Sequence, residues 1–223
     1  VNWGATGLTK AGNFTLTLTG NNTGTGAINL TAGIIRATTS ANALGTGTAS
    51  LSLSGATTVL QLANDTALNF ARNTTVSAAT TITADRLTSA ATSTTHTLGT
   101  LTIGAQTLSI TRGSNITTTG IGGITFGSVT QTGAAIFDVG ASATLTLGAL
   151  QTTGQNITKQ GTGTIVLGTA ANALRVAGSN TLTAGTMRLG SVSALGTTGA
   201  TLVLNGGTLD LATDTTVNAY NTT

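Results

Sequence analysis

Short runs in which apolar residues alternate with threonine recur along the whole chain. Clear examples are Leu16–Leu18, Leu101–Ile103 and Leu145–Leu147. A period of two, in stretches bounded by Gly, Asn and Ser, is typical of short half-buried β-strands, and no stretch favours a helix. Two-residue hairpin turns are nearly absent, Asn205-Gly206 being the exception, so we do not expect a series of hairpins.

The alternating runs repeat at a longer interval, which is the signature of a solenoid. From Leu101 onward, pairs of apolar residues that we expect to point inward follow one another at steps of about 21 residues. These pairs, with an earlier one, are Leu60/Leu62, Leu101/Ile103, Ile124/Phe126, Leu145/Leu147, Ile165/Leu167, Met187/Leu189 and Leu209/Leu211. Nearly the same step separates Leu108, Val129 and Leu150, and also Gly99, Gly120, Gly140 and Gly161, which we expect to turn corners with positive φ.

Three apolar clusters per rung of about 21 residues predict three short strands and three corners per turn. We therefore predict an all-β fold, a right-handed parallel β-helix formed by residues 1–223 as a single β-solenoid. About ten rungs spaced by ~4.8 Å give a rod near ~50 Å long. The absence of proline fits, because proline removes a ladder hydrogen bond from almost any position in such a rod.

A second, slower repeat indicates a duplicated unit, at about 7–70 and 156–219, flanking a middle section of similar rungs. The offset is about 150 residues, or roughly seven rungs. Four segments are echoed in this way: Leu8–Gly12 by Ile157–Gly161, Leu30–Gly33 by Leu182–Gly185, Ala43–Gly45 by Ala194–Gly196, and Leu62–Asp65 by Leu211–Asp214.

Composition narrows the function classes. Only 6% of the 223 residues are charged, and the eight Lys and Arg form no cluster that could follow nucleic-acid phosphates. No apolar run reaches the ~18 residues of a membrane-spanning helix. Without cysteine there is neither a disulfide nor a thiolate metal site. Val1 in place of an initiator Met indicates a processed chain or a fragment.

The echoed segments carry a family resemblance. Leu8–Gly26, followed by Leu30–Gly33 and Ala43–Gly45, resembles the autotransporter-associated β-strand repeat, which reads roughly L-x-K-x-G-x-G-x-L-x-L-x-G-x-N-T-Y-T-G and continues with A-G-T-L and A-L-G segments. The second copy, Ile157–Leu211, is similar, and Gly24 stands where the family often has Tyr. The resemblance implies a large secreted bacterial surface protein with a β-helical passenger.

Acidic residues are the first candidates for chemistry, because polysaccharide-acting β-helices need two or three carboxylates in one cleft. Asp65 and Asp85 are the one acidic pair at a one-rung spacing, and Asp210 and Asp214 are close in sequence without a third carboxylate. Since Asp is a common corner residue and Asp65 recurs as Asp214, we interpret Asp65 as a corner residue. We expect no catalytic, cofactor-binding or metal site, and no cofactor.

Basic residues and the single histidine receive structural interpretations. Two basic residues of the first copy, Lys10 and Arg36, recur in the second copy as Lys159 and Arg188. We interpret all four as solvated side chains whose aliphatic stems cover a strand or a corner. His96 lies among threonines without an acidic or cysteine motif, so we expect it at the surface.

Threonine suggests two further possibilities. Ice binding needs an unbroken file of threonines, but the outward residues of the apolar pairs run Thr102, Thr125, Thr146, Val166, Arg188 and Asp210. Asn-x-Thr glycosylation sequences occur at Asn13, Asn21, Asn29, Asn64, Asn73, Asn115, Asn156 and Asn221.

A structural or adhesive role remains. Few charges favour association, and open strand edges at solenoid ends pair with another chain unless they are capped. We expect a non-catalytic subunit of an extracellular bacterial surface filament, joined to copies of itself through its ends or strand edges, with cell-surface or matrix glycans as a further possible partner and no nucleic acid or membrane span. The alternatives are a β-helical autotransporter passenger or adhesin stalk and, behind it, a polysaccharide-acting enzyme or an ice-binding solenoid.

Overall fold

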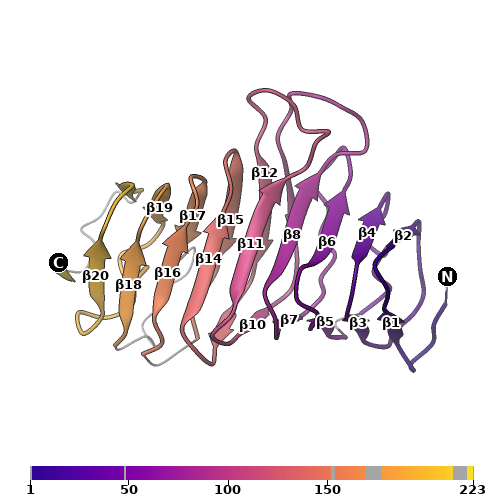
Figure 1. Cartoon of the computed structure of the whole chain (residues 1–223), viewed down its shortest axis with the longest axis horizontal. Helices are drawn as coiled ribbons and strands as arrows, with labels where there is room; N and C mark the ends of the chain where they lie inside the picture. Colours follow the sequence, from indigo (N-terminus) through magenta and orange to yellow (C-terminus); the bar gives the residue numbers. More distant parts are fainter. Residues whose placement is uncertain (1, 48, 152–153, 169–176, 213–219, 223) are drawn as a thin grey trace.

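The alternating segments form strands that coil into a parallel β-solenoid (Figure 1). The computed structural model describes residues 2–47, 49–151, 154–168, 177–212 and 220–222. Across these residues the fold is all-β, with no helix, and the chain makes about 9 turns of ~22 residues each. The predicted parallel solenoid is confirmed, with about nine turns in place of the expected ten.

The strands lie in three parallel sheets that run along the axis. Sheet A contains β1 (Leu8–Lys10), β3 (Ile28–Leu30), β5 (Leu51–Leu53), β7 (Thr74–Val76), β10 (Leu101–Ile103) and β13 (Val129–Gln131). Sheet B contains β2 (Thr15–Thr19), β4 (Ile34–Thr38), β6 (Thr58–Ala63), β8 (Thr80–Asp85), β11 (Thr107–Arg112), β14 (Ala135–Val139), β16 (Ile157–Gln160), β18 (Ser179–Leu182), β20 (Thr201–Leu204) and β22 (Asn221–Thr222). Sheet C contains β9 (Thr94–Thr97), β12 (Gly122–Phe126), β15 (Ala143–Leu147), β17 (Thr164–Leu167), β19 (Thr186–Leu189) and β21 (Thr208–Leu211).

Inward side chains stack in columns along the axis and form the core. In sheet B one column is aliphatic over five successive strands, and each of its members is fully buried. Because alternate residues of a strand point to the same face, in-register pairing keeps each column continuous from rung to rung. The column runs Ile35, Leu60, Ile82, Ile110 and Val139.

The rungs are not uniform, which corrects the expectation of three strands in every turn. Among the residues that the structure describes, only the middle of the chain, from β7 to β15, places strands on all three sheets. The strands described in the first rungs lie on sheets A and B, and those described in the last rungs lie on sheets B and C. Rung length varies with this change: Leu101 pairs with Val129, 28 residues later, whereas Thr144 pairs with Thr164 after 20.

Because the rungs differ in length, only some of the predicted apolar pairs stack in one column on the same sheet. The apolar pairs from Ile124 to Leu209 stack in sheet C as expected, through Leu145, Ile165 and Met187. The two earlier pairs do not join them: Leu60/Leu62 lies on sheet B, and Leu101/Ile103 on sheet A. Loops near β8 and β11 lengthen the middle rungs to about 28 residues, so a constant step of 21 misplaces everything before them.

The structure confirms only part of the two other predicted series, the apolar column that begins at Leu108 and the four corner glycines. Val129 and Leu150 are bridged, but Leu108 belongs to sheet B, so it is not part of their column. Of the four corner glycines, only Gly161 has positive φ, at 71°; the expectation was wrong for the three others, Gly99, Gly120 and Gly140.

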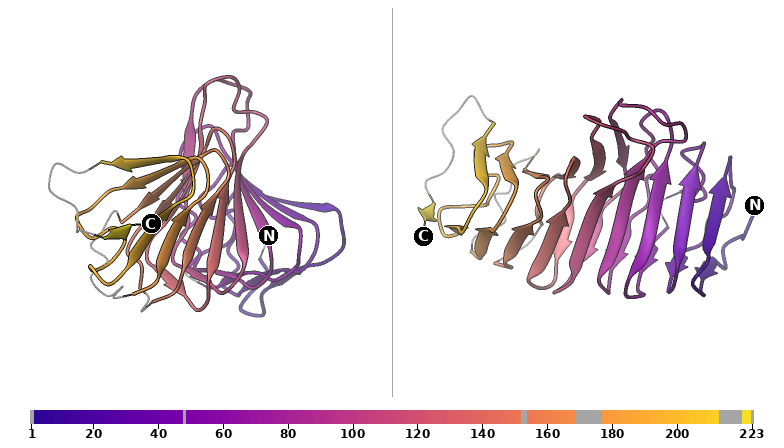
Figure 2. Two further views of the ribbon diagram at one scale, coloured as in Figure 1. Left: turned by 60° about the vertical axis from the view of Figure 1, so that its left-hand side comes forward. Right: turned by 45° about the horizontal axis from the view of Figure 1, so that its top comes forward.

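The two copies of the duplicated unit occupy different faces of the solenoid. The unit at 7–70 begins with β1 on sheet A and β2 on sheet B, whereas the unit at 156–219 begins with β16 on sheet B and β17 on sheet C. The same sequence pattern is thus rotated by one face about the axis. Figure 2 shows the accompanying twist of the solenoid, with successive strands fanned about the long axis. Asp214, the last echoed residue, lies outside the described residues.

Candidate functional site at the Asp85 corner

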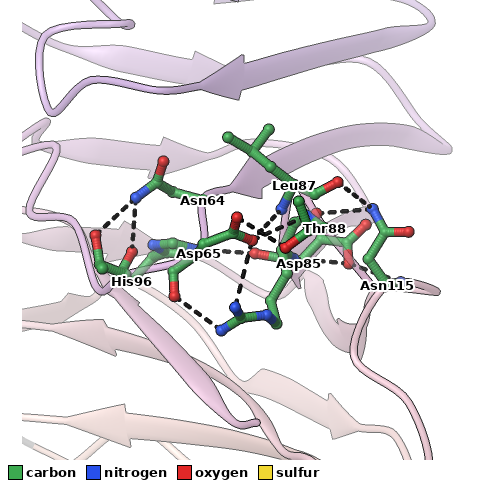
Figure 3. A network of polar contacts seen from close by, with 9 residues as sticks. Asn64, Asp65, Asp85, Leu87, Thr88, His96 and Asn115 are labelled. Carbon is green, nitrogen blue, oxygen red and sulfur yellow. Dashed lines mark hydrogen bonds and ion pairs between the residues drawn. The ribbon is translucent and has the colours of Figure 1, made fainter. Parts of the chain in front are cut away.

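One corner between sheets B and C gathers Asp65, Asp85 and His96, the acidic pair and the histidine that the sequence singled out (Figure 3). Asp85 is the last residue of β8, and His96 lies in β9, where sheet C begins. Asp65 follows β6 on the preceding rung, and the Asn64 N–H donates to the Asp85 carbonyl oxygen at 3.2 Å. The corner therefore joins consecutive rungs.

The Asp85 carboxylate is buried and accepts three hydrogen bonds. Its Oδ1 accepts from the backbone N–H of Arg86 at 2.8 Å and of Asn115 at 3.0 Å. Its Oδ2 accepts from the Gln61 side-chain amide at 2.9 Å. Each oxygen is already occupied by the chain itself, so the carboxylate acts as a fixed acceptor that ties three rungs together.

Asp65 organises the segment that leaves β8. Its Oδ1 accepts from the backbone N–H of Leu87 at 3.0 Å and of Thr88 at 2.9 Å, and its Oδ2 accepts from the Thr88 hydroxyl at 2.9 Å. The Arg86 guanidinium lies 3.5 Å from Oδ1. The backbone N–H of Thr88 lowers the pKa of Asp65 most, its hydroxyl and Arg86 lower it further, and partial desolvation opposes them. Asp65 is the corner residue that the sequence suggested.

His96 is fully buried, which corrects the expectation of a surface histidine. Its Nδ1 accepts from the Leu68 N–H at 3.3 Å, so its Nε2 carries the proton and donates to the Asp85 carbonyl oxygen at 3.1 Å. The Phe70 ring packs against it edge-on, with centroids 5.8 Å apart. Alternation places His96 on the inward side of β9, and local composition did not reveal that Leu68 of the preceding rung and Asp85 of the same rung supply its partners.

Acid should destabilise the fold through this histidine. Burial lowers the pKa of His96 below its ordinary value, against a smaller opposing effect of Asp85. The unfolded state binds a proton below about pH 6.5 while the folded state stays neutral, so stability falls as the pH drops from there toward the lowered pKa. Denaturant melts should show this loss between about pH 6.5 and 5, above the carboxylate range, in the native chain but not in His96→Gln. Equal slopes would contradict it.

The corner holds a projection on the side of the rod. Two long loops, residues 86–93 and 113–121, leave sheet B there and rise above the neighbouring rungs (Figure 1). They pair with each other, since the Ala90 N–H donates to the Asn115 carbonyl at 2.9 Å and the Thr117 N–H to the Ala90 carbonyl at 2.8 Å. The Asn115 amide also donates to the Arg86 carbonyl at 2.8 Å. The network's evident role is to fix these loops.

The two carboxylates of this corner both bond to the chain's own backbone. Asp65 accepts from the N–H groups of Leu87 and Thr88, and Asp85 accepts from those of Arg86 and Asn115. In the described part of the chain, no group of three His, Cys, Asp or Glu side chains is placed to hold a metal ion.

Lys10 and Lys159 are buried clamps, which corrects the expectation of solvated stems. The Lys10 ammonium donates to the carbonyl oxygens of Ala11 at 2.9 Å, Gly12 at 2.6 Å and Ala32 at 3.0 Å. The first two acceptors lie at the lysine's own corner, and the third lies on the next rung. Each clamp thus ties one rung to the next.

Lys159 repeats this arrangement one face further round. It donates to the carbonyls of Gln160 at 2.5 Å, Gly161 at 2.7 Å and Ala184 at 3.2 Å. A Cβ added to Gly185 would lie 2.9 Å from this ammonium, as one added to Gly33 would lie 2.8 Å from that of Lys10. The repeated Lys-x-Gly and Ala-Gly segments therefore encode a lysine enclosed by backbone.

A further buried cation escaped sequence analysis. Arg72 is fully buried, and its guanidinium donates to the carbonyls of Ala49 at 3.1 Å and Gly24 at 3.3 Å, which lie on earlier rungs. Burial lowers the pKa of this arginine. No local pattern marks the position, because its acceptors are 23 and 48 residues away.

The outer face of sheet C carries a groove of about 430 Å³. Thr125, Thr146, Val166, Arg188 and Asp210 follow one another in register, as the sequence indicated, and Arg188 pairs with Asp210 at 2.7 Å. Thr102 lies on sheet A and does not join this file. The groove is lined by Ile121, Thr144, Thr164, Val166, Thr186, Arg188, Thr208 and Asp210.

Two of the Asn-x-Thr positions serve the Asp85 corner. The Asn64 amide donates to the carbonyl and the hydroxyl of Thr66, at 3.1 and 2.8 Å, and the Asn115 amide donates within the loop pair. Both amides are thus engaged in internal hydrogen bonds.

Comparisons with known proteins leave the family open. No protein-family model, no curated protein and no solved structure matches this chain. None of the described residues form a helix that is long and apolar enough to span a membrane. The likeness to the autotransporter-associated repeat stays a prediction.

Proposed function

We propose that this chain is a non-catalytic structural protein of a bacterial cell surface, a β-solenoid subunit that joins copies of itself through strand edges. The observation that carries the proposal is how each sheet ends. Sheets A and B begin with β1 and β2, and sheets C and B finish with β21 and β22, so each of these strands has one edge without a partner among the described strands. Such edges are templates for pairing with another chain.

Exposed apolar side chains accompany these edges. Leu211 of β21 is 53% exposed and Leu204 of β20 is 44% exposed, although the equivalent positions of inner rungs are buried. At the other end Phe14, beside β2, is 87% exposed. Stacking a further rung would remove this apolar surface from water, which favours association.

The use of charge also supports a structural role. Four buried charged side chains bond to backbone groups of their own or neighbouring rungs: Lys10, Lys159, Arg72 and Asp85. These hydrogen bonds hold successive turns together, which is a structural use of the charged groups. An extracellular location belongs to the same proposal and is supported by the likeness of the echoed segments to surface-protein repeats.

A second candidate function, an adhesin stalk or passenger, is favoured by the projecting loop pair. Residues 86–93 and 113–121 stand out from an otherwise regular rod and are held by Asp65 and Asp85 (Figures 1 and 2). A rod with a fixed lateral projection is suited to presenting that projection to a partner, including a surface glycan.

The two candidates separate in one experiment. We expect the full chain to form rods longer than a single copy in negative-stain electron microscopy, and sedimentation velocity to show growth with concentration. Leu211→Asp should raise the concentration needed for assembly about tenfold or more, because a buried unpaired carboxylate is costly. Val192→Asp changes a similarly exposed residue, 41% exposed, that is not on an end strand and should assemble normally. Monodisperse short rods at every concentration would reject assembly and leave the stalk.

A further inference from the structure

A file of threonines runs along the outer face of sheet C on four successive rungs. Thr144 of β15 pairs in register with Thr164 of β17, Thr164 with Thr186 of β19, and Thr186 with Thr208 of β21. Each alternates with an inward residue of its strand, so the hydroxyls point outward and repeat along the axis at the rung spacing of ~4.8 Å. All four threonines line the groove of about 430 Å³.

The protein does not use these hydroxyls for its own hydrogen bonds. In the part of the chain that the structure describes, none of the four is bonded to a protein group. On the outer face of sheet B, by contrast, Thr83 and Thr111 lie on paired strands and their hydroxyls bond to each other at 2.8 Å. The threonine file of sheet C therefore keeps its donors and acceptors for another molecule.

An ion pair in the same groove also has hydrogen-bonding capacity to spare. Arg188 donates from its Nε to Asp210 Oδ2 at 2.7 Å, and the two side chains are 51% and 33% exposed. Neither side chain makes another hydrogen bond within the described residues, so the terminal amino groups of Arg188 and Oδ1 of Asp210 remain available. The two charges of the groove lining cancel, which favours an uncharged polar ligand.

Apolar side chains complete the lining. Val166 lies in register with Arg188, and Ile121, directly before β12, is 44% exposed. Sites for organic ligands combine apolar surface with a few polar groups that fix the ligand's orientation. A sugar ring suits such a lining, because it carries hydroxyls around its edge and C–H groups on its faces.

We propose that the groove on the outer face of sheet C binds an extended, uncharged polysaccharide whose chain lies along the solenoid axis, with successive sugar residues on successive rungs. The threonine hydroxyls and the ion pair exchange hydrogen bonds with the sugar hydroxyls, and Val166 and Ile121 contact ring C–H groups. A hexose in an extended β-1,4-linked chain is about as long as one rung is high, so the same contacts recur at each step. The groove lies on the side of the rod, so this binding does not depend on end-to-end assembly.

The shape of this face favours a polymer over ice. A crystal of ice presents a rigid plane, and an ice-binding face has to match it over a regular, flat array. Here Val166, Arg188 and Asp210 replace threonine in the neighbouring file, and the face is hollowed. The sheets also twist along the axis (Figure 2), which a flexible chain can follow and a crystal plane cannot.

Two glucose hexamers that differ only in linkage test the geometry. Cellohexaose is β-1,4-linked and extended, whereas maltohexaose is α-1,4-linked and coiled. Isothermal titration calorimetry of the full chain should show binding of cellohexaose, and maltohexaose should bind at least tenfold more weakly. Chitohexaose, the extended hexamer of N-acetylglucosamine, extends the test to a second uncharged sugar.

Paired valine substitutions locate the site. Thr164→Val combined with Thr186→Val removes two hydroxyls and keeps two β-branched side chains, so the strands should form as before. Affinity for the extended hexamer should fall about tenfold or more, because two hydrogen bonds are lost. Thr158→Val with Thr181→Val is the matched control, since these outward threonines are paired in the same way on sheet B, and it should bind like the native chain.

The outcomes separate cleanly. Binding of an extended hexamer that the sheet C pair weakens and the sheet B pair does not would support the groove. Failure of both extended hexamers to bind at millimolar concentration would overturn it, as would equal binding of maltohexaose or equal affinity in the sheet C variant. Inhibition of ice recrystallisation without sugar binding would also overturn it. Electron microscopy reports end-to-end assembly separately, so either idea can fail without the other.

Discussion

Replacing Asp85 with alanine is expected to destabilise the fold by about 3–5 kcal/mol. The carboxylate accepts two backbone N–H groups, of Arg86 and Asn115, and the Gln61 amide, and it is 1% exposed. Alanine would leave these donors buried without an acceptor, and hydrogen bonds to a charged group contribute more than neutral ones. Chemical denaturation followed by circular dichroism measures the loss.

Two variants make the comparison specific. Asp85→Asn keeps an oxygen for the two backbone donors and places an amide toward Gln61, so we expect a smaller loss than with alanine. Asp65→Ala removes contacts to Leu87 and Thr88 at a partly exposed site and should cost less than Asp85→Ala. Hydrogen exchange should accelerate at Asn115 in Asp85→Ala. An alanine variant as stable as the native chain would contradict the role we assign to this carboxylate.

Replacing Lys159 with methionine is expected to cost about 2–4 kcal/mol at neutral pH. Methionine fills similar space but leaves the carbonyls of Gln160, Gly161 and Ala184 without their charged donor. The same change at Lys10 should act similarly, because its ammonium makes the equivalent contacts. The two corners share no contact, so the losses should add in the double variant.

The pH dependence of Lys159 gives a second measurement. Burial lowers its pKa to about 8 from 10.5, with Asp138 opposing. Between these values the unfolded state holds the proton that the folded state has released, so unfolding free energy should rise with pH, by at most about 1.4 kcal/mol per pH unit. Lys159→Met should lack this rise. A native chain whose stability is flat from pH 8 to 10.5, like the variant, would refute the assignment.

The local alternation of apolar and polar residues was enough to predict the strands and their parallel coiling. It was not enough to predict the length of each rung. Leu145, Ile165, Met187 and Leu209 stack as predicted because the segments between them have nearly equal length. Leu101 does not stack on the same sheet, because the loops around residues 86–93 and 113–121 add residues that carry no alternating pattern. A period is readable only where the connections keep it constant.

The candidate site shows the same division. Sequence spacing indicated that Asp65 and Asp85 lie one rung apart, and both take part in one network. It did not show that Asn115 and Gln61 complete the shell of Asp85, since they lie 30 and 24 residues away along the chain. The burial of His96 and Lys159 was missed for a related reason. A polar residue can occupy an inward position when a neighbouring rung supplies its hydrogen-bond partners, and composition does not report those partners.

The alternating strands, their parallel stacking into rungs and the repetition of one unit along the chain could all be predicted from the amino-acid sequence. These follow from side-chain alternation and from turn residues, which act over a few positions. Three features became apparent only in the folded chain: which of the three faces each copy of the duplicated unit occupies, the rotation of the second copy by one face, and the burial of particular charged groups. Those outcomes depend on the lengths of all the preceding connections. Each residue added to a loop changes where the following strands lie around the axis, and therefore which strands they pair with.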